Sequence, residues 1–146
     1  MDESGMVVNS RRLTWFHAAI ALVMIAAVVA RLIPGTRTID DAFITFRYSR
    51  NIVEGIGFVY NPGVLTLGTT TPLFTLILAG VGAIMGGGDY PNYAIVISAL
   101  ADAITCALLI VIARRIIRND VIALLPGALW AISPMSVTFA IGGMET

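Results

Sequence analysis

The chain alternates long apolar runs with short polar segments, and the lengths of these runs predict its elements. Runs over about 13–33, 93–113 and 121–141 each come close to the roughly 20 residues that cross a bilayer core as a helix. A fourth run, 72–85, reaches only about 22 Å as a helix, which is short of a core of about 30 Å. We therefore expect an all-α membrane protein with three transmembrane helices and a shorter helix, over about 72–85, that lies along the outer face or re-enters it.

The first apolar run also fits a cleaved signal peptide, because Val28 and Ala30 suit a cleavage site. However, the 18 residues from Leu13 to Ala30 carry no charge, and this run is longer than the roughly 7–15 residues of a signal-peptide core. We therefore interpret it as an uncleaved membrane anchor.

The distribution of arginine predicts how the chain crosses the membrane. Two arginines precede the first span, and Arg114–Arg118 is a short basic segment between the second and third spans. Since short basic loops stay in the cytoplasm, we expect a cytoplasmic N-terminus and one long outer loop over 34–92. Glu145 then returns to the outer side, which also carries the adjacent acids at 40–41. The outer arginines count against this topology, but they are spread over a loop of about 60 residues, where the rule weakens.

The composition is that of a membrane protein. Of 146 residues, 58% are hydrophobic and 12% are charged, whereas soluble domains carry about 25% charged residues. The formal net charge of zero argues against a nucleic-acid partner, and we expect a multi-pass protein in the lipid bilayer of the cell membrane. The single cysteine, Cys106, lies in an apolar run and excludes an internal disulfide. The apolar end at 142–146, closed by one acid, predicts an N-terminal fragment of a longer protein.

The outer loop begins with two adjacent carboxylates, Asp40 and Asp41, at the start of a helix expected over about 41–54. Asp40 suits the N-cap, and Asp41 lies in the first turn, where the helix dipole favours negative charge. Gly55 ends this helix. One acid is enough for capping, so the second indicates another role, such as a general base.

Polar side chains recur along one face of the same helix at the spacing i, i+3, i+4 and i+7; they are Arg47, Arg50, Asn51 and Glu54. The two arginines can bind a phosphate through charge-assisted hydrogen bonds. They can equally contact lipid headgroups, or pair with Glu54 or the aspartates. The polar run 68–72 precedes the next helix; we expect Thr71 to cap that helix and Pro72 to occupy its first turn, with substrate hydrogen bonding as the lesser interpretation.

Other polar residues have simpler interpretations. Asp102 lies inside the second span, where an acid marks either a functional interior or, as we favour, a helix-packing hydrogen bond. His17 is an interfacial residue with no second ligand near it, and Trp15 and Tyr90 are predicted interface anchors. The two adjacent acids can share a divalent cation, but the sequence offers no third ligand, so we assign no metal or other cofactor and leave the cation as an alternative.

Two segments resemble a known family. Over about residues 39–75 the order and spacing match; the matching pieces are Asp40–Ile44, Arg47, Arg50-Asn51, Glu54-Gly55, Gly57, Val59–Gly63 and Thr71–Leu73. The segment 142–146 matches again through Gly143-Met144-Glu145-Thr146. Together they resemble the first outer loop, and the end of the third span, of polytopic membrane glycosyltransferases of the GT-C type. The closest likeness is to bacterial relatives of the mycobacterial terminal arabinofuranosyltransferases.

The resemblance implies transfer of a sugar from a polyprenyl-phosphate donor to a hydroxyl of a glycan, lipid or protein acceptor at the outer face, with inversion. It assigns the catalytic base to Asp41 or Asp40 and makes Glu145 a second acid near the reaction centre. Substrate binding then falls to Arg47, Arg50, Asn51 and Glu145. The family's chains are several times longer and carry an acidic stretch where this chain has Val64–Gly68. The sugar and acceptor are therefore not predicted. A transporter fragment and a non-catalytic membrane scaffold are the alternatives.

Overall fold

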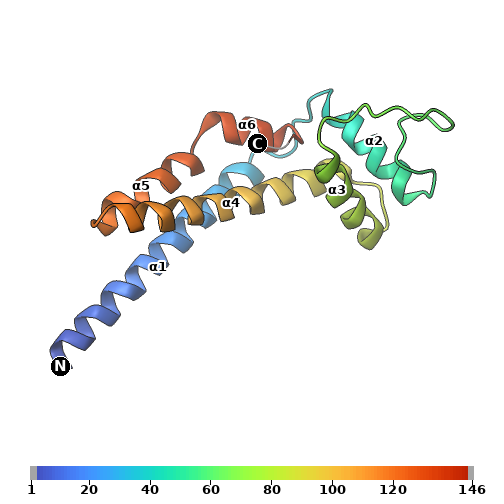
Figure 1. Ribbon diagram of the computed structural model, residues 1–146. Coiled ribbons are helices and arrows are strands. Elements are labelled where there is room, and N and C mark those ends of the chain that lie inside the picture. The colour runs from blue at the N-terminus through green and yellow to red at the C-terminus, as the bar shows by residue number, and fades with distance from the viewer. Residues whose placement is uncertain (1–2, 145–146) are drawn as a thin grey trace. The chain divides into compact units, whose positions relative to one another are not determined.

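The structure, a computed structural model, describes the backbone of residues 3–144 and the side chains of residues 14–144. This part of the chain is all-helical, as expected, and contains no strand (Figure 1). The helices are α1 (Glu3–Leu32), α2 (Ala42–Val53), α3 (Pro72–Met85), α4 (Tyr90–Ile116), α5 (Asp120–Ala131) and α6 (Pro134–Ile141).

Two of these helices are long and apolar enough to cross a membrane. They contain the segments Thr14–Leu32 and Tyr90–Ile116, with mean hydropathies of 2.0 and 2.6. The third span was expected as one helix over 121–141, and this is wrong: the segment forms α5 and α6, which are bent by 42° at their junction. Pro134 begins α6 and lacks a backbone N–H, so it cannot continue the α5 hydrogen-bond ladder. If this bent pair is counted as one span, three segments of the described chain are long and apolar enough to cross a membrane.

The described chain divides into two compact units. One, here called the span unit, consists of residues 3–30 and 100–136. The other, the loop unit, consists of residues 31–99 and 137–144. We describe each unit by itself.

In the loop unit, α2 packs against α3 (Figure 1). Phe46 of α2 stacks on Tyr90 with ring centroids 6.5 Å apart, and Leu78 completes this core. The prediction that Tyr90 anchors the chain at a membrane interface is wrong, since its side chain is 1% exposed. Gly82 makes this burial possible, because a Cβ on Gly82 would lie 2.9 Å from the Tyr90 hydroxyl.

In the span unit, small side chains let the helices approach closely, as is common between membrane helices. Ala27, Cys106 and Ala131 form its buried core. Asp102 is buried beside this core and accepts hydrogen bonds from Trp130 Nε1 at 2.9 Å and from Ser136 Oγ at 2.8 Å. These contacts are of the helix-packing kind that the sequence favours for Asp102.

Candidate functional site

Neither of the two adjacent carboxylates at the start of α2 makes a capping hydrogen bond to this helix. Asp41, not Asp40, occupies the N-cap position, and its side chain makes no capping hydrogen bond. Its backbone is already helical, with φ −63° and ψ −29°. The N–H groups of residues 42, 43 and 44 instead bond the carbonyls three residues earlier, at 3.0 to 3.1 Å. The cap assignment of Asp40 is therefore wrong, and the helix end does not need either acid.

The loop that follows α2 folds back over this helix and is held by two of its side chains. The Asn51 amide is buried and donates to Val59 O at 2.6 Å and to Tyr60 O at 3.1 Å. Arg47 donates through Nε to Tyr60 O at 2.9 Å and through Nη2 to Asn61 Oδ1 at 3.0 Å. Its guanidinium also lies 4.4 Å from the centroid of the Tyr60 ring. Both residues were predicted to bind substrate, and both side chains hold the loop.

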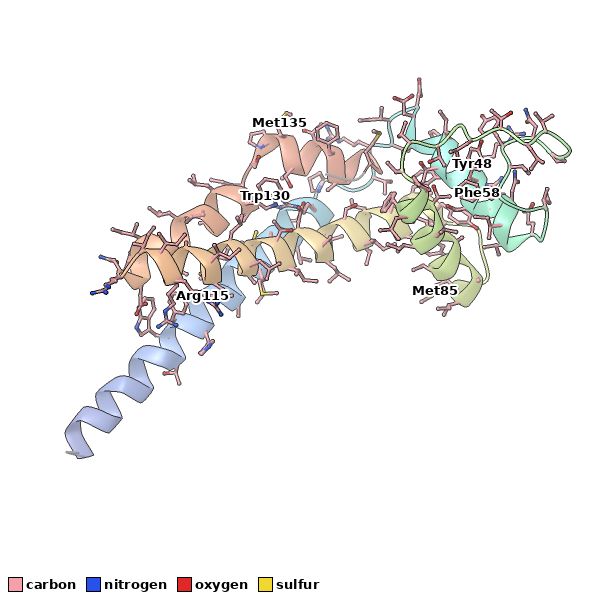
Figure 2. All side chains as sticks on the ribbon, viewed as in Figure 1. Tyr48, Phe58, Met85, Arg115, Trp130 and Met135 are labelled. Atoms are coloured by element: carbon pink, nitrogen blue, oxygen red, sulfur yellow. The ribbon has the colours of Figure 1, made fainter. Side chains whose placement is uncertain are left out.

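Tyr48 ties the second half of the loop to α2. Its hydroxyl donates to Thr66 O and accepts from Gly68 N, the latter at 2.8 Å. Its ring lies 5.2 Å from that of Phe58, centroid to centroid. Figure 2 labels both residues beside the loop. Aromatic contact and hydrogen bonding thus fix a segment that has no regular secondary structure.

Buried hydroxyls join the end of this loop to α3. Ser49 Oγ lies 2.9 Å from Thr45 O and 2.9 Å from Thr75 O. Thr75 Oγ1 lies 3.2 Å from Thr69 Oγ1. Pro72 begins α3 as predicted, but Thr71 makes no side-chain capping bond, so that part of the prediction is wrong. The Thr71 carbonyl accepts from Thr75 N and Oγ1, both at 3.0 Å, as the carbonyl of an N-cap residue ordinarily does.

The last described residues also reach the start of α2. Backbone N–H groups of Arg37 and Ile39 donate to the carbonyls of Ile141 and Gly142 at 2.8 and 3.0 Å. Gly143 follows with φ +78°, and a Cβ there would lie 2.8 Å from Phe46 Cζ. Only glycine meets both demands, the left-handed backbone and the close approach. The loop unit therefore brings residues about 100 positions apart in sequence together.

These segments enclose a pocket of about 220 Å³, here called the acid pocket. It is lined by Asp41, Ala42, Ile44, Thr45, Gly68, Thr69, Thr70, Thr71, Gly143 and Met144. Among the residues that the structure describes, neither the Asp41 carboxylate nor the Thr70 hydroxyl has a hydrogen-bond partner. The acid pocket thus presents an acceptor and a donor that the fold itself does not use.

Two further pockets lie along α2. The aromatic pocket, of about 320 Å³, shares Ile44 and Gly68 with the acid pocket. Its full lining is Ile44, Tyr48, Tyr60, Asn61, Val64, Thr66 and Gly68. The arginine pocket, of about 410 Å³, is lined by Phe43, Phe46, Arg47, Arg50, Asn51, Glu54 and Tyr60. Pockets lined by a carboxylate, by aromatic rings and by guanidinium groups thus follow one another along α2.

The predicted site residues are only partly brought together. Both aspartates are exposed, but only Asp41 lines the acid pocket. The arginines line a separate pocket, and nine residues of helix place Arg50 about 13 Å from Asp41 along the axis. Arg50 is exposed and has no hydrogen-bond or ion-pair partner among the described residues. Glu145 lies outside the described residues.

Sequence reasoning gave too little weight to the polar run Gly68–Thr71, which forms one wall of the acid pocket. A signal was present, since three consecutive threonines between apolar segments exceed what one helix cap needs. The same reasoning gave Tyr48 no role. Within residues 14–144, no three His, Cys, Asp or Glu side chains lie close enough to hold a metal ion.

Comparisons of the chain with protein-family models, with curated proteins and with solved structures gave no match. Its function is therefore inferred from the residues of the acid pocket and from the resemblance seen in the sequence.

Proposed function

We propose that this chain contributes the acid pocket of a membrane glycosyltransferase of the GT-C type. The enzyme moves a sugar from a polyprenyl-phosphate donor to an acceptor hydroxyl at the outer face of the cell membrane. The observation that carries the proposal is the Asp41 carboxylate, which no cap uses and which lines a pocket beside threonine hydroxyls. The resemblance supplies the reaction class, and the apolar helices α1 and α4 fit a lipid-borne donor.

Asp41 is the general base in this proposal. It accepts the proton of the acceptor hydroxyl while that oxygen attacks the anomeric carbon of the donor. The bond from the anomeric carbon to the phosphate oxygen breaks, the polyprenyl phosphate leaves, and the configuration at that carbon inverts. Proton removal by a positioned carboxylate typically contributes about 10²- to 10⁴-fold to the rate. Asp40 lies outside the pocket, so the choice that the sequence left open falls on Asp41.

The remaining groups suit the other parts of a glycosyl donor. The Thr70 hydroxyl is free to hydrogen-bond a sugar hydroxyl beside Asp41. The neighbouring aromatic pocket offers the rings of Tyr48 and Tyr60 to the apolar face of a sugar. Negative charge grows on the leaving phosphate, and we assign its stabilisation to Arg50, because Arg47 is occupied by the loop. The glycan, lipid or protein nature of the acceptor stays open.

The experiment compares Asp41→Asn and Asp40→Asn in membranes of cells that express the gene. The readout is transfer of labelled sugar from synthetic polyprenyl-phosphate sugars. Asp41→Asn keeps the size of the side chain and removes its basicity, so we expect a loss of at least about 100-fold. Asp40→Asn is the matched control and should retain most of the activity. Equal activity of both variants and the parent contradicts the base assignment.

A transporter is the second candidate, because the bend between α5 and α6 resembles the broken helices of transporters. Asp102, the acid in the middle of α4, counts against it, since this residue already accepts hydrogen bonds from Trp130 and Ser136. An absence of sugar transfer by the parent, with every sugar tested, would favour this candidate.

A further inference from the structure

A second polar site lies in the span unit, far along the sequence from the acid pocket. A pocket of about 470 Å³, here called the basic pocket, is formed by α1 and α4. It is lined by Phe16, His17, Ile20, Val111, Arg114 and Arg115. The α1 residues are spaced i, i+1 and i+4, and the α4 residues i, i+3 and i+4, so each set follows one helix face. Figure 2 labels Arg115 where these two helices meet.

Only one of the two arginines of the basic pocket pairs with an acid among the side chains of residues 14–144. Arg114 donates through Nε to Asp120 Oδ1 at 2.9 Å and stacks over Phe16, 3.9 Å from the ring centroid. Asp120 is thereby used by Arg114. Arg115 is exposed and has no acidic partner among the side chains of residues 14–144. Among the side chains of residues 14–144, the pocket therefore combines one guanidinium paired with Asp120, a second guanidinium without an acidic partner, and an imidazole.

The other three residues that line the basic pocket are apolar. Phe16, Ile20 and Val111 belong to the two helices that are long and apolar enough to cross a membrane. Trp15, next to the pocket on α1, is 41% exposed, and indole rings gather at the boundary between headgroups and hydrocarbon. A ligand of this pocket thus meets cations at one end and hydrocarbon at the other.

We infer that the basic pocket binds the phosphate headgroup of an anionic phospholipid. The phosphate lies between Arg115 and His17, and the acyl chains run along Ile20 and Val111. Arginine suits this role because its planar guanidinium forms paired hydrogen bonds with phosphate oxygens. A basic pocket between membrane helices, on the side marked by the positive-inside rule, matches the leaflet where anionic lipids are recognised. This inference does not depend on the glycosyltransferase proposal.

The test uses the full chain in an uncharged detergent and counts bound lipids by native mass spectrometry. The probes are phosphatidylglycerol and phosphatidylcholine with identical acyl chains, and inorganic phosphate as a competitor. We expect the parent to prefer phosphatidylglycerol. Arg115→Gln should weaken its binding about fivefold, the usual contribution of one arginine near an anionic lipid surface. Arg115→Lys should retain part of the preference because it keeps the charge.

Two controls make the outcome decisive. Arg118→Gln removes an exposed arginine that does not line the pocket, and it should leave phosphatidylglycerol binding unchanged. His17→Ala, an independent variant for the case that Arg115→Gln misfolds by circular dichroism, should weaken binding about threefold through loss of one hydrogen bond. The inference is overturned if the two lipids bind equally, or if Arg118→Gln weakens binding as much as Arg115→Gln. Displacement of the lipid by millimolar inorganic phosphate would overturn it as well, since it would show a free-anion site.

Discussion

The loop unit and the span unit are stabilised in different ways. The loop unit contains a long segment without regular secondary structure between Val53 and Pro72, and side chains hold it through hydrogen bonds to its backbone. The span unit is helical almost throughout, so its backbone groups are satisfied within the helices. Its core consists of small residues, with Asp102 as the one buried acid among its described side chains.

This difference helps to separate polar side chains with a structural role from those available for function. In the loop unit several polar side chains hold the backbone through hydrogen bonds, and Asn51, Tyr48 and Ser49 are examples. The Asp41 carboxylate makes no such bond and lines a pocket, and our proposal depends on that combination. In the span unit, Asp102 is the acid that stands within an apolar run of the sequence. It accepts hydrogen bonds from Trp130 and Ser136, so its role there is in helix packing.

The largest expected effect on stability comes from the close packing of the span unit. A Cβ on Gly127 would lie 2.6 Å from Ile110 Cγ1 and 2.7 Å from the Cys106 carbonyl oxygen, and a backbone oxygen cannot easily move away. Gly127→Ala should therefore lower the free energy of unfolding by about 2 kcal/mol, measured by titration with sodium dodecyl sulfate. The control is Gly80→Ala in α3, where a Cβ meets no atom within 4 Å. It should raise stability by about 0.5 kcal/mol. Equal effects of the two variants would show that the helices of the span unit are not closely packed at Gly127.

A smaller effect is expected from the hydrogen bonds of the loop unit. Tyr48→Phe removes a hydroxyl that bonds both Thr66 O and Gly68 N, and it leaves the Gly68 N–H without this acceptor. We expect a loss of about 1.5 kcal/mol and faster hydrogen exchange over residues 64–70. Tyr60→Phe is the matched control, because the Tyr60 hydroxyl has no hydrogen-bond partner among the described residues. If both variants exchange alike, the hydroxyl of Tyr48 does not fix the loop.

The helices were largely predictable from local signals. The apolar run 72–85, with Pro72 in front and Gly86 behind, forms α3 with those bounds. Gly55 follows the last turn of α2 and has φ +75°, as a stop signal should. The division of the third apolar run into α5 and α6 was missed, although Pro134 lies inside it. Length and hydropathy alone predict one span there. Neither takes account of the N–H group that proline lacks, which a continuous helix would need at this position.

The candidate site was less predictable because it depends on contacts between distant segments. Nothing local brings Gly143 to Phe46 and Ala42, and the packing of the whole loop unit is required for it. The helix-wheel argument placed Arg47 and Asn51 on one face correctly, but it could not foresee the returning loop that uses both side chains. Burial was equally impossible to predict from charge alone, since the Arg31 side chain is 0% exposed.

The central claim is that Asp41, unlike its neighbour, acts as a base, and chemical rescue tests it most directly. Asp41→Ala leaves room for a small carboxylate in the acid pocket, so added formate should restore sugar transfer at least about tenfold over the variant alone. Formate should not stimulate Asp40→Ala, which should remain active without it. An Asp41→Ala variant that keeps its activity, or one that formate cannot restore while Asp40→Ala responds, would contradict the account.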